Sequence, residues 1–164
     1  TDIVDGNVAV SCTPASGAWF GVGESTVTCT AEDTRSNKAT STFKIYVTYN
    51  FSGFFRPVDN LPVANVVQAG QAIPVKFSLG GNQGMNIFTA GYPRVQVMSC
   101  ANNALQDTVE ETVTAGSSSL QYQASGEYHY VWKTDKSWSG TCRQLQVKFA
   151  DGTTQALANF QFKK

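Results

Sequence analysis

The chain has 164 residues, room for one large or two small domains, and its hydrophobic content of 41% is enough to fill cores of ordinary size. Twelve basic and twelve acidic residues cancel, so charge gives no reason to expect binding to nucleic acid or to an anionic membrane surface. No stretch approaches about 18 consecutive apolar residues, so we expect no membrane span.

The first 49 residues predict a β-meander. Residues 7–12, 24–32 and 39–49 alternate apolar and polar side chains, as strands do, and residues 13–23 between the first two are rich in Gly. Residues 33–37 supply Asp, Ser and Asn, which favour a turn. The side chains expected to face inward are Val8, Val10, Cys12, Val27, Cys29, Ala31, Phe43, Ile45 and Val47.

This first segment resembles a known module over residues 5–48. The matching pieces are Ser11-Cys12, Pro14, Ser16-Gly17, Phe20, Val22-Gly23, the strand at 26–31, Asp33 and Asn37. They are similar to the second half of the HYR (hyalin repeat) module, which implies an immunoglobulin-like β-sandwich of adhesive and cell-surface proteins. In contrast to the family, Arg35-Ser36 stands where a small residue and glycine usually precede Asn37.

The strands that open a HYR module do not precede Thr1, so we expect the first module to be incomplete at its N-terminus. A sandwich without them exposes an apolar face and unpaired edges. A boundary inside the module is the favoured explanation. Packing of the second module over the gap is an alternative, and so is a neighbouring subunit that supplies the missing strands.

Residues 50–69 predict a stiff linker between two modules. Phe51, Phe54 and Phe55 are followed by two prolines, Pro57 and Pro62. Three phenylalanines in five positions would be costly in water, so we expect them to pack between the modules and fix their angle.

The second module is predicted at residues 70–164. In residues 73–79 the apolar side chains share one face, and residues 156–162 are expected to pair with 142–149 through a type I′ turn at Asp151-Gly152. Further strands are expected at 92–100, 120–123 and 128–133, and residues 109–113 fit either a strand or one helical turn.

This segment looks like the bacterial PxKF domain, whose name is spelled by Pro74-Val75-Lys76-Phe77. The likeness extends over 78–81, 91–93, 110–113, 130–136, Trp138, 140–143 and 160–162. It implies a C-terminal module of large secreted bacterial proteins, often behind HYR repeats, and implies no activity.

Four cysteines fall in two pairs, one in each predicted module. Local pairing, Cys12 with Cys29 and Cys100 with Cys142, is favoured among the three connectivities. A structural zinc site is the alternative, but the chain has no CxxC motif and a single histidine. Disulfides persist only in an oxidising compartment, so the sequence predicts an extracellular or cell-surface location.

The residue inventory offers no catalytic set and no cofactor or metal site. His129 is the only histidine and has no apparent nucleophile, because the cysteines are expected in bridges. Glu110 and Glu111 are neighbours on a predicted strand and so point apart, and Asp2 and Asp5 lack the spacing of a calcium loop. We therefore expect no enzyme.

Aromatic residues are the remaining candidates for a ligand. Tyr130, Trp132 and Trp138 could contact a glycan, with Trp138, in a predicted loop, expected to be the most exposed. Structural packing of the set is favoured, because side chains at period two in a sandwich usually face the core.

The sequence thus predicts an all-β chain of two tandem immunoglobulin-like sandwiches, the first incomplete, with one disulfide in each. The predicted function is a non-catalytic accessory segment of a secreted or cell-surface bacterial protein that spaces, presents or anchors other domains of the same polypeptide, with adhesion as an added role. The alternatives are a carbohydrate-binding appendage of an exported hydrolase, which would bind cell-wall or extracellular polysaccharide, and a strand-exchanged subunit of an extracellular fibre.

Overall fold

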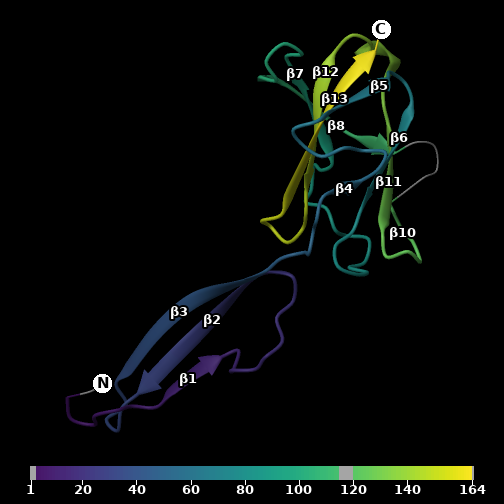
Figure 1. Ribbon diagram of the computed structural model, residues 1–164. Coiled ribbons are helices and arrows are strands. Elements are labelled where there is room, and N and C mark those ends of the chain that lie inside the picture. The colour runs from purple at the N-terminus through teal and green to yellow at the C-terminus, as the bar shows by residue number, and fades with distance from the viewer. Residues whose placement is uncertain (1–2, 115–119, 164) are drawn as a thin grey trace. The chain divides into compact units, whose positions relative to one another are not determined.

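The computed structural model of the protein describes residues 3–114 and 120–163. The chain divides into two compact units, Thr1–Thr48 and Tyr49–Lys164 (Figure 1). Apart from one 3-10 helix at Lys136–Trp138, every helix or strand among the described residues is a β-strand. The all-β class predicted from the sequence is confirmed.

The first unit is a single three-stranded antiparallel sheet. Its strands are β1 (Val10–Thr13), β2 (Gly23–Glu32) and β3 (Lys38–Val47), in the order β1-β2-β3. Val27 lies opposite Phe43, and Cys29 lies between Cys12 and Ser41. Since side chains alternate along a strand, these residues share one face, and the threonines between them line the other. The described residues therefore hold one sheet of the expected sandwich.

The hairpin between β2 and β3 departs from an ordinary tight turn. The Asp33 carboxylate accepts hydrogen bonds from the backbone N–H groups of Arg35 and Asn37 and from the Asn37 amide. The bond from the Asn37 side chain is the main reason that the pKa of Asp33 lies below its usual value. Ser36 has a φ of 67°, a left-handed conformation that L side chains rarely adopt.

The second unit contains two five-stranded sheets. The first has the order β10-β11-β6-β4, with β9 paired to β11, and the second has the order β5-β13-β12-β7-β8. The strands of the first sheet are β4 (Phe54–Phe55), β6 (Ala72–Phe77), β9 (Val113–Thr114), β10 (Gln121–Tyr122) and β11 (Tyr128–Lys133). Those of the second are β5 (Ala64–Gln68), β7 (Arg94–Met98), β8 (Leu105–Glu111), β12 (Cys142–Lys148) and β13 (Gln155–Lys163).

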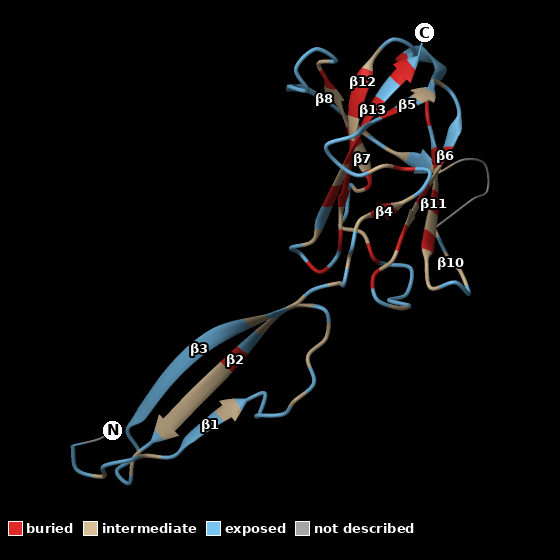
Figure 2. Cartoon of the chain, in the orientation of Figure 1, coloured by how far each residue is buried: buried red, intermediate tan, exposed pale blue. Residues whose placement is uncertain are grey.

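One hydrophobic core joins the two sheets into a β-sandwich. Val75, Phe77 and Trp132 of the first sheet form a single buried cluster with Leu145 and Phe160 of the second. The alternation expected for residues 73–79 is confirmed, because Ile73, Val75, Phe77 and Leu79 are buried and the residues between them are not. Buried segments concentrate in this unit, whereas the first unit shows few (Figure 2).

The segment predicted as a linker belongs to the second unit. Residues 50–69 supply β4 to one sheet and β5 to the other, and the unit begins at Tyr49. Phe51 and Phe54 pack with Phe77 in its core, with ring centroids 6.3 and 6.5 Å from that of Phe77, and Phe55 is half-buried in β4. The two prolines that suggested a linker, Pro57 and Pro62, lie between β4 and β5 and do not separate the segment from the unit.

The turn between β12 and β13 is not of type I′. That turn needs positive φ at both central residues, and of the Asp151-Gly152 pair only Gly152, with a φ of 81°, has it. Asp151 is 2% exposed and its carboxylate accepts bonds from the N–H groups of Tyr49, Thr153 and Thr154 and from the Thr154 hydroxyl. The carboxylate thereby fixes the turn and the first residue of the unit together.

Candidate functional site

Both predicted disulfides are present. Cys12 and Cys29 are directly opposite in the β1–β2 pair, with an S–S distance of 2.07 Å and Cα atoms 4.0 Å apart. Cys100, just after β7, is bonded to Cys142 at the start of β12, with an S–S distance of 2.02 Å. Neither strand pair can separate fully while its bridge is closed.

The aromatic residues proposed as glycan contacts are buried. Trp132 is 0%, Tyr130 6% and Trp138 7% exposed, so the expectation that Trp138 is an exposed platform is wrong. The Trp138 ring packs against Trp132 and Phe162 at centroid distances of 5.8 and 5.5 Å. Burial raises the pKa of Tyr130, even though its hydroxyl is hydrogen-bonded to Thr112, which acts in the opposite direction. None of the three rings offers a flat face to a sugar.

The side chain of Arg143 covers one face of the Trp138 ring. Its guanidinium lies 4.2 Å from the centroid of the Trp138 ring, and its Nη1 donates to Glu110 Oε1 at 2.7 Å. The side chain is only 9% exposed, and its Nε has no hydrogen-bond partner among the residues that the structure describes. Cation–π contact and charge pairing together offset the cost of burying this cation. Sequence reasoning did not single out Arg143, because nothing local distinguishes it from a surface arginine.

A polar cleft of about 260 Å³ lies beside this pair. One side is lined by Glu110, Glu111, Thr112 and Val113, from the end of β8 to the start of β9. The other side is lined by Lys133, Thr134, Asp135 and Trp138, from the end of β11 to the end of the helix. Three of the segments that the sequence analysis compared with the PxKF domain, residues 110–113, residues 130–136 and Trp138, contribute to this lining. The Asp135 carboxylate accepts the N–H of Ser137 at 2.7 Å, which lowers the pKa of Asp135. The Thr112 and Thr134 hydroxyls donate to the carbonyls of Pro93 and Gln71. The two hydroxyls and the Asp135 carboxylate therefore support the backbone around the cleft.

The titratable candidates lie apart. His129 Nε2 is 3.2 Å from Glu127 Oε2, and His129 is opposite Lys76 in the β6–β11 pair. Asp5 accepts from the Thr34 hydroxyl at 2.9 Å, and Asp2 lies outside the described residues. Within residues 3–114 and 120–163, no group of three His, Cys, Asp or Glu side chains is placed to hold a metal ion. In the same residues, no helix is long and apolar enough to cross a membrane.

The apolar face of the first unit is largely uncovered. Among its described residues Val27 is the only buried hydrophobic side chain, while Val10 and Phe43 on the same face are 64% and 51% exposed. Two shallow hollows of roughly 270 and 280 Å³ lie on this face, one beside Val10 and Ala39 and one beside Val27 and Phe43. The opposite face is polar and carries a Glu24–Lys44 ion pair of 2.7 Å, which lowers the pKa of Glu24. This unit therefore presents an apolar sheet face with room for further side chains.

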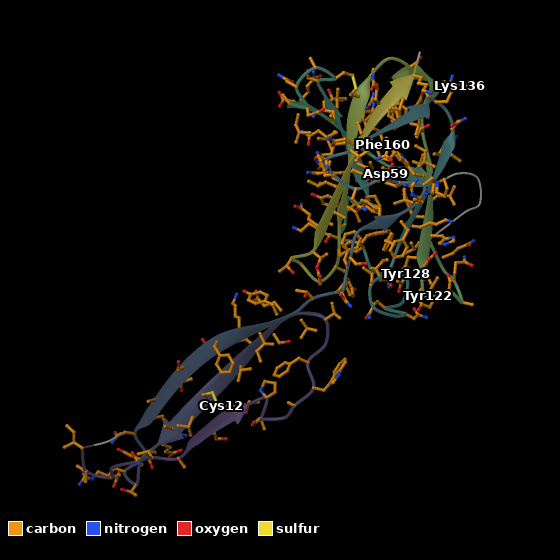
Figure 3. All side chains as sticks on the ribbon, viewed as in Figure 1. Cys12, Asp59, Tyr122, Tyr128, Lys136 and Phe160 are labelled. Atoms are coloured by element: carbon orange, nitrogen blue, oxygen red, sulfur yellow. A yellow bond between two sulfur atoms is a disulfide. The ribbon has the colours of Figure 1, made fainter. Side chains whose placement is uncertain are left out.

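Two asparagines hold the segment before and within β5 in place. Asn60 Oδ1 accepts the Phe54 N–H and its Nδ2 donates to the Phe54 carbonyl, both at 2.8 Å. Asn65, 6% exposed, accepts the Asp59 N–H and donates to the carbonyls of Asp59 and Asn159. Figure 3 labels Asp59 of this segment and Phe160 of β13, both in the second unit. The sequence analysis missed both asparagines, although Asn in a proline-containing segment commonly bonds to nearby backbone.

The comparisons with curated proteins and with solved structures show no family for the chain. No curated protein shows a significant sequence match to the chain. A solved structure of the titin immunoglobulin tandem domains A164-A165 is 12% identical, with a TM-score of 0.30, and the alignment covers 85% of this chain and 62% of that one. The titin domains z1z2 in complex with telethonin are 11% identical, with a TM-score of 0.28 and coverages of 85% and 61%. The chain thus spans less than two thirds of either structure.

Residues 1–47 match the sequence profile of the HYR domain. HYR domains are extracellular modules, and the two disulfides are consistent with an oxidising environment. Both findings fit a non-catalytic structural role. The likeness of residues 70–164 to the PxKF domain stays a prediction. The first unit is therefore similar to a HYR domain, followed by a disulfide-closed β-sandwich.

Proposed function

We propose that the chain is an accessory segment of a secreted or cell-surface protein that spaces, presents or anchors another domain of the same polypeptide. The observation that carries the proposal is that two separate β units are each closed by a disulfide between strands. Such bridges restrict the unfolded chain and so keep small units folded outside the cell. A bacterial source and an adhesive role belong to this proposal.

A reporter fusion tests the spacing role. A hydrolase fused to the N-terminus of the chain is attached to beads through Lys164, and its turnover of a soluble and of a particle-bound substrate is compared with that of the same hydrolase attached directly. A spacer leaves turnover of the soluble substrate unchanged and increases turnover of the particle-bound one. A change in the soluble reaction, or no gain on particles, contradicts the proposal.

A substitution at the buried Trp138 tests the carbohydrate-binding alternative. Trp138→Phe keeps a ring against Trp132 and Phe162 and should retain the fold. We expect the original chain and this variant to be retained equally poorly on insoluble cellulose, chitin and cell-wall material. Retention of the original chain alone would favour the glycan-binding function.

The uncovered face of the first unit favours a second candidate, a fibre subunit completed by strand exchange. An open three-stranded sheet with one buried hydrophobic residue is marginal on its own, so a strand from a neighbouring subunit would stabilise it. Sedimentation at several protein concentrations should then show association, and Phe43→Asp should abolish it. A monomer at every concentration removes this candidate.

A further inference from the structure

The pairing of β5 with β13 differs from every other strand pairing among the described residues. These two strands run parallel, whereas the others pair antiparallel. β13 is the last strand of the chain, and β5 is the second strand of the unit, after the two-residue β4. The pair therefore joins the beginning of the second unit directly to its end.

The register decides how tension along the chain acts on this pair. Ala64 lies beside Asn159 and Gln68 beside Lys163. The chain from the N-terminal side enters β5 at Ala64, and the chain leaves β13 at Lys163, at the opposite end of the pair. Pulling on the two termini therefore slides the strands past each other, so the hydrogen bonds of the whole pair share the load.

Contacts around the pair resist that sliding. The buried Asn65 side chain donates to the Asn159 carbonyl at 3.1 Å, which adds a bond across the two strands. On its other side β13 pairs with β12 from Gln155 to Gln161, and Phe160 and Phe162 are buried in the core. The strand pairing loaded before β5 is shorter, since β4 pairs with β6 at two positions and β5 pairs with β13 at five.

The second disulfide limits how far the unit can extend once the pair has ruptured. The Cys100–Cys142 bridge closes a loop with a sequence separation of 42 residues, which contains β8 to β11. While the bridge is closed, tension cannot extend that loop. At up to about 3.6 Å per residue, the bridge withholds about 150 Å of chain.

We propose that the second unit bears tension, with the β5–β13 pair as the contact that resists the pull and Cys100–Cys142 as a stop that limits its extension. The biological use of this property rests on the proposed spacing or anchoring function. The resistance to tension does not rest on that function, because it follows from the register of the β5–β13 pair and is measured without any fused domain.

Single-molecule pulling on the full, oxidised chain tests the proposal in two geometries. In the first, handles are attached at the two termini; in the second, they are attached at the C-terminus and at Gln68→Cys, an exposed position, with intact mass confirming that both native bridges persist. The second geometry loads the adjacent Gln68 and Lys163 ends and peels the strands apart one bond at a time. We expect the terminal geometry to require at least twice the rupture force.

Two matched variants distinguish the contribution of the β5–β13 pair to the rupture force from a general loss of stability. Asn65→Ala should lower the rupture force in the terminal geometry, whereas Asn60→Ala removes comparable backbone bonds away from β13 and should leave that force unchanged. Reduction of the bridge should lengthen the unit's extension by about 150 Å. Equal forces in the two geometries, or equal effects of the two variants, would overturn the inference while leaving the reporter test of spacing intact.

Discussion

Asp151 links the start of the second unit to the hairpin near its end. Burial acts to raise the pKa of this carboxyl group, but hydrogen bonds from the Thr154 hydroxyl and from the Tyr49, Thr154 and Thr153 N–H groups outweigh burial and lower it. A carboxylate whose pKa is lower in the folded than in the unfolded chain stabilises the fold above the unfolded pKa, about 3.9. That stabilisation is lost as the pH falls through the folded pKa.

We expect Asp151→Asn to lower the free energy of unfolding by about 2 kcal/mol at neutral pH, because an amide accepts through one oxygen only and loses the charge. The difference from the original chain should shrink below about pH 4. Urea denaturation between pH 7 and pH 2.5 measures this difference in the free energy of unfolding, and Asp107→Asn, at an exposed position, is the control. A loss of the same size at both ends of this range contradicts the account.

Ser36 stands in the β2–β3 turn with a φ of 67°, at a position where the HYR module usually has glycine. Glycine adopts that conformation without a Cβ penalty. Ser36→Gly should therefore raise the free energy of unfolding of the first unit by up to about 1 kcal/mol. Arg35→Gly is the matched control, since Arg35 has no positive φ and glycine there only adds freedom to the unfolded chain. Hydrogen exchange of the hairpin amides reports both effects, and protection raised equally by both contradicts the strain at Ser36.

Trp138 shows what a residue-level pattern leaves open. The sequence predicts a loop at this position, and the structure has a three-residue 3-10 helix there, after β11. Its predicted exposure is wrong, because the ring is covered by Arg143, Trp132 and Phe162, which come from three different strands. A linear sequence carries no signal for which distant side chains cover a loop residue.

At the scale of elements, alternation predicted the antiparallel strands well. The expected strand at 128–133 coincides with β11 (Tyr128–Lys133), and that at 24–32 differs from β2 (Gly23–Glu32) by one residue. The β4 and β5 strands were missed. β4 has two residues, too few for a periodic pattern, and β5 pairs in parallel with a strand at the other end of the unit, for which no turn signal exists.

The Cys12–Cys29 bridge is the main covalent restraint on β1, an edge strand of four residues. Replacing both cysteines by alanine should destabilise the first unit by about 3 kcal/mol, from the loop entropy that the bridge removes. The Val10–Thr13 amides should then lose protection from hydrogen exchange. Alanines at Cys100 and Cys142 serve as the control and should leave those amides protected. Retained protection in the first variant would show that strand pairing alone holds β1.

The start of the second unit at Tyr49, rather than at residue 70, gives a second test. A fragment of residues 49–164 contains every strand of the sandwich, and we expect it to fold cooperatively. A fragment of residues 70–164 lacks β4 and β5, an edge strand of each sheet, and with them the buried Phe54 and Val58. We expect it not to reach a fixed tertiary structure, as judged by near-ultraviolet circular dichroism. Equal spectra would restore residues 50–69 as a linker.

At the scale of the whole chain, the two units differ greatly in buried hydrophobic surface. The second unit has a core that spans both sheets, whereas Val27 is the one buried hydrophobic residue described in the first. Calorimetry should therefore resolve two transitions, with the first unit melting at the lower temperature and reduction lowering both. A single transition whose calorimetric and van't Hoff enthalpies agree would contradict separate unfolding.

The position of β13 also sets the order of events during synthesis. The sheet places β13, a strand of nine residues, between β5 and β12, so this place in the sheet stays empty until Gln155–Lys163 has left the ribosome. β5 has no strand to pair with until β13 is synthesised, after almost all of the sandwich. Contacts between strands so distant along a chain form slowly. The second sheet of this unit therefore cannot be completed until β13 has been synthesised.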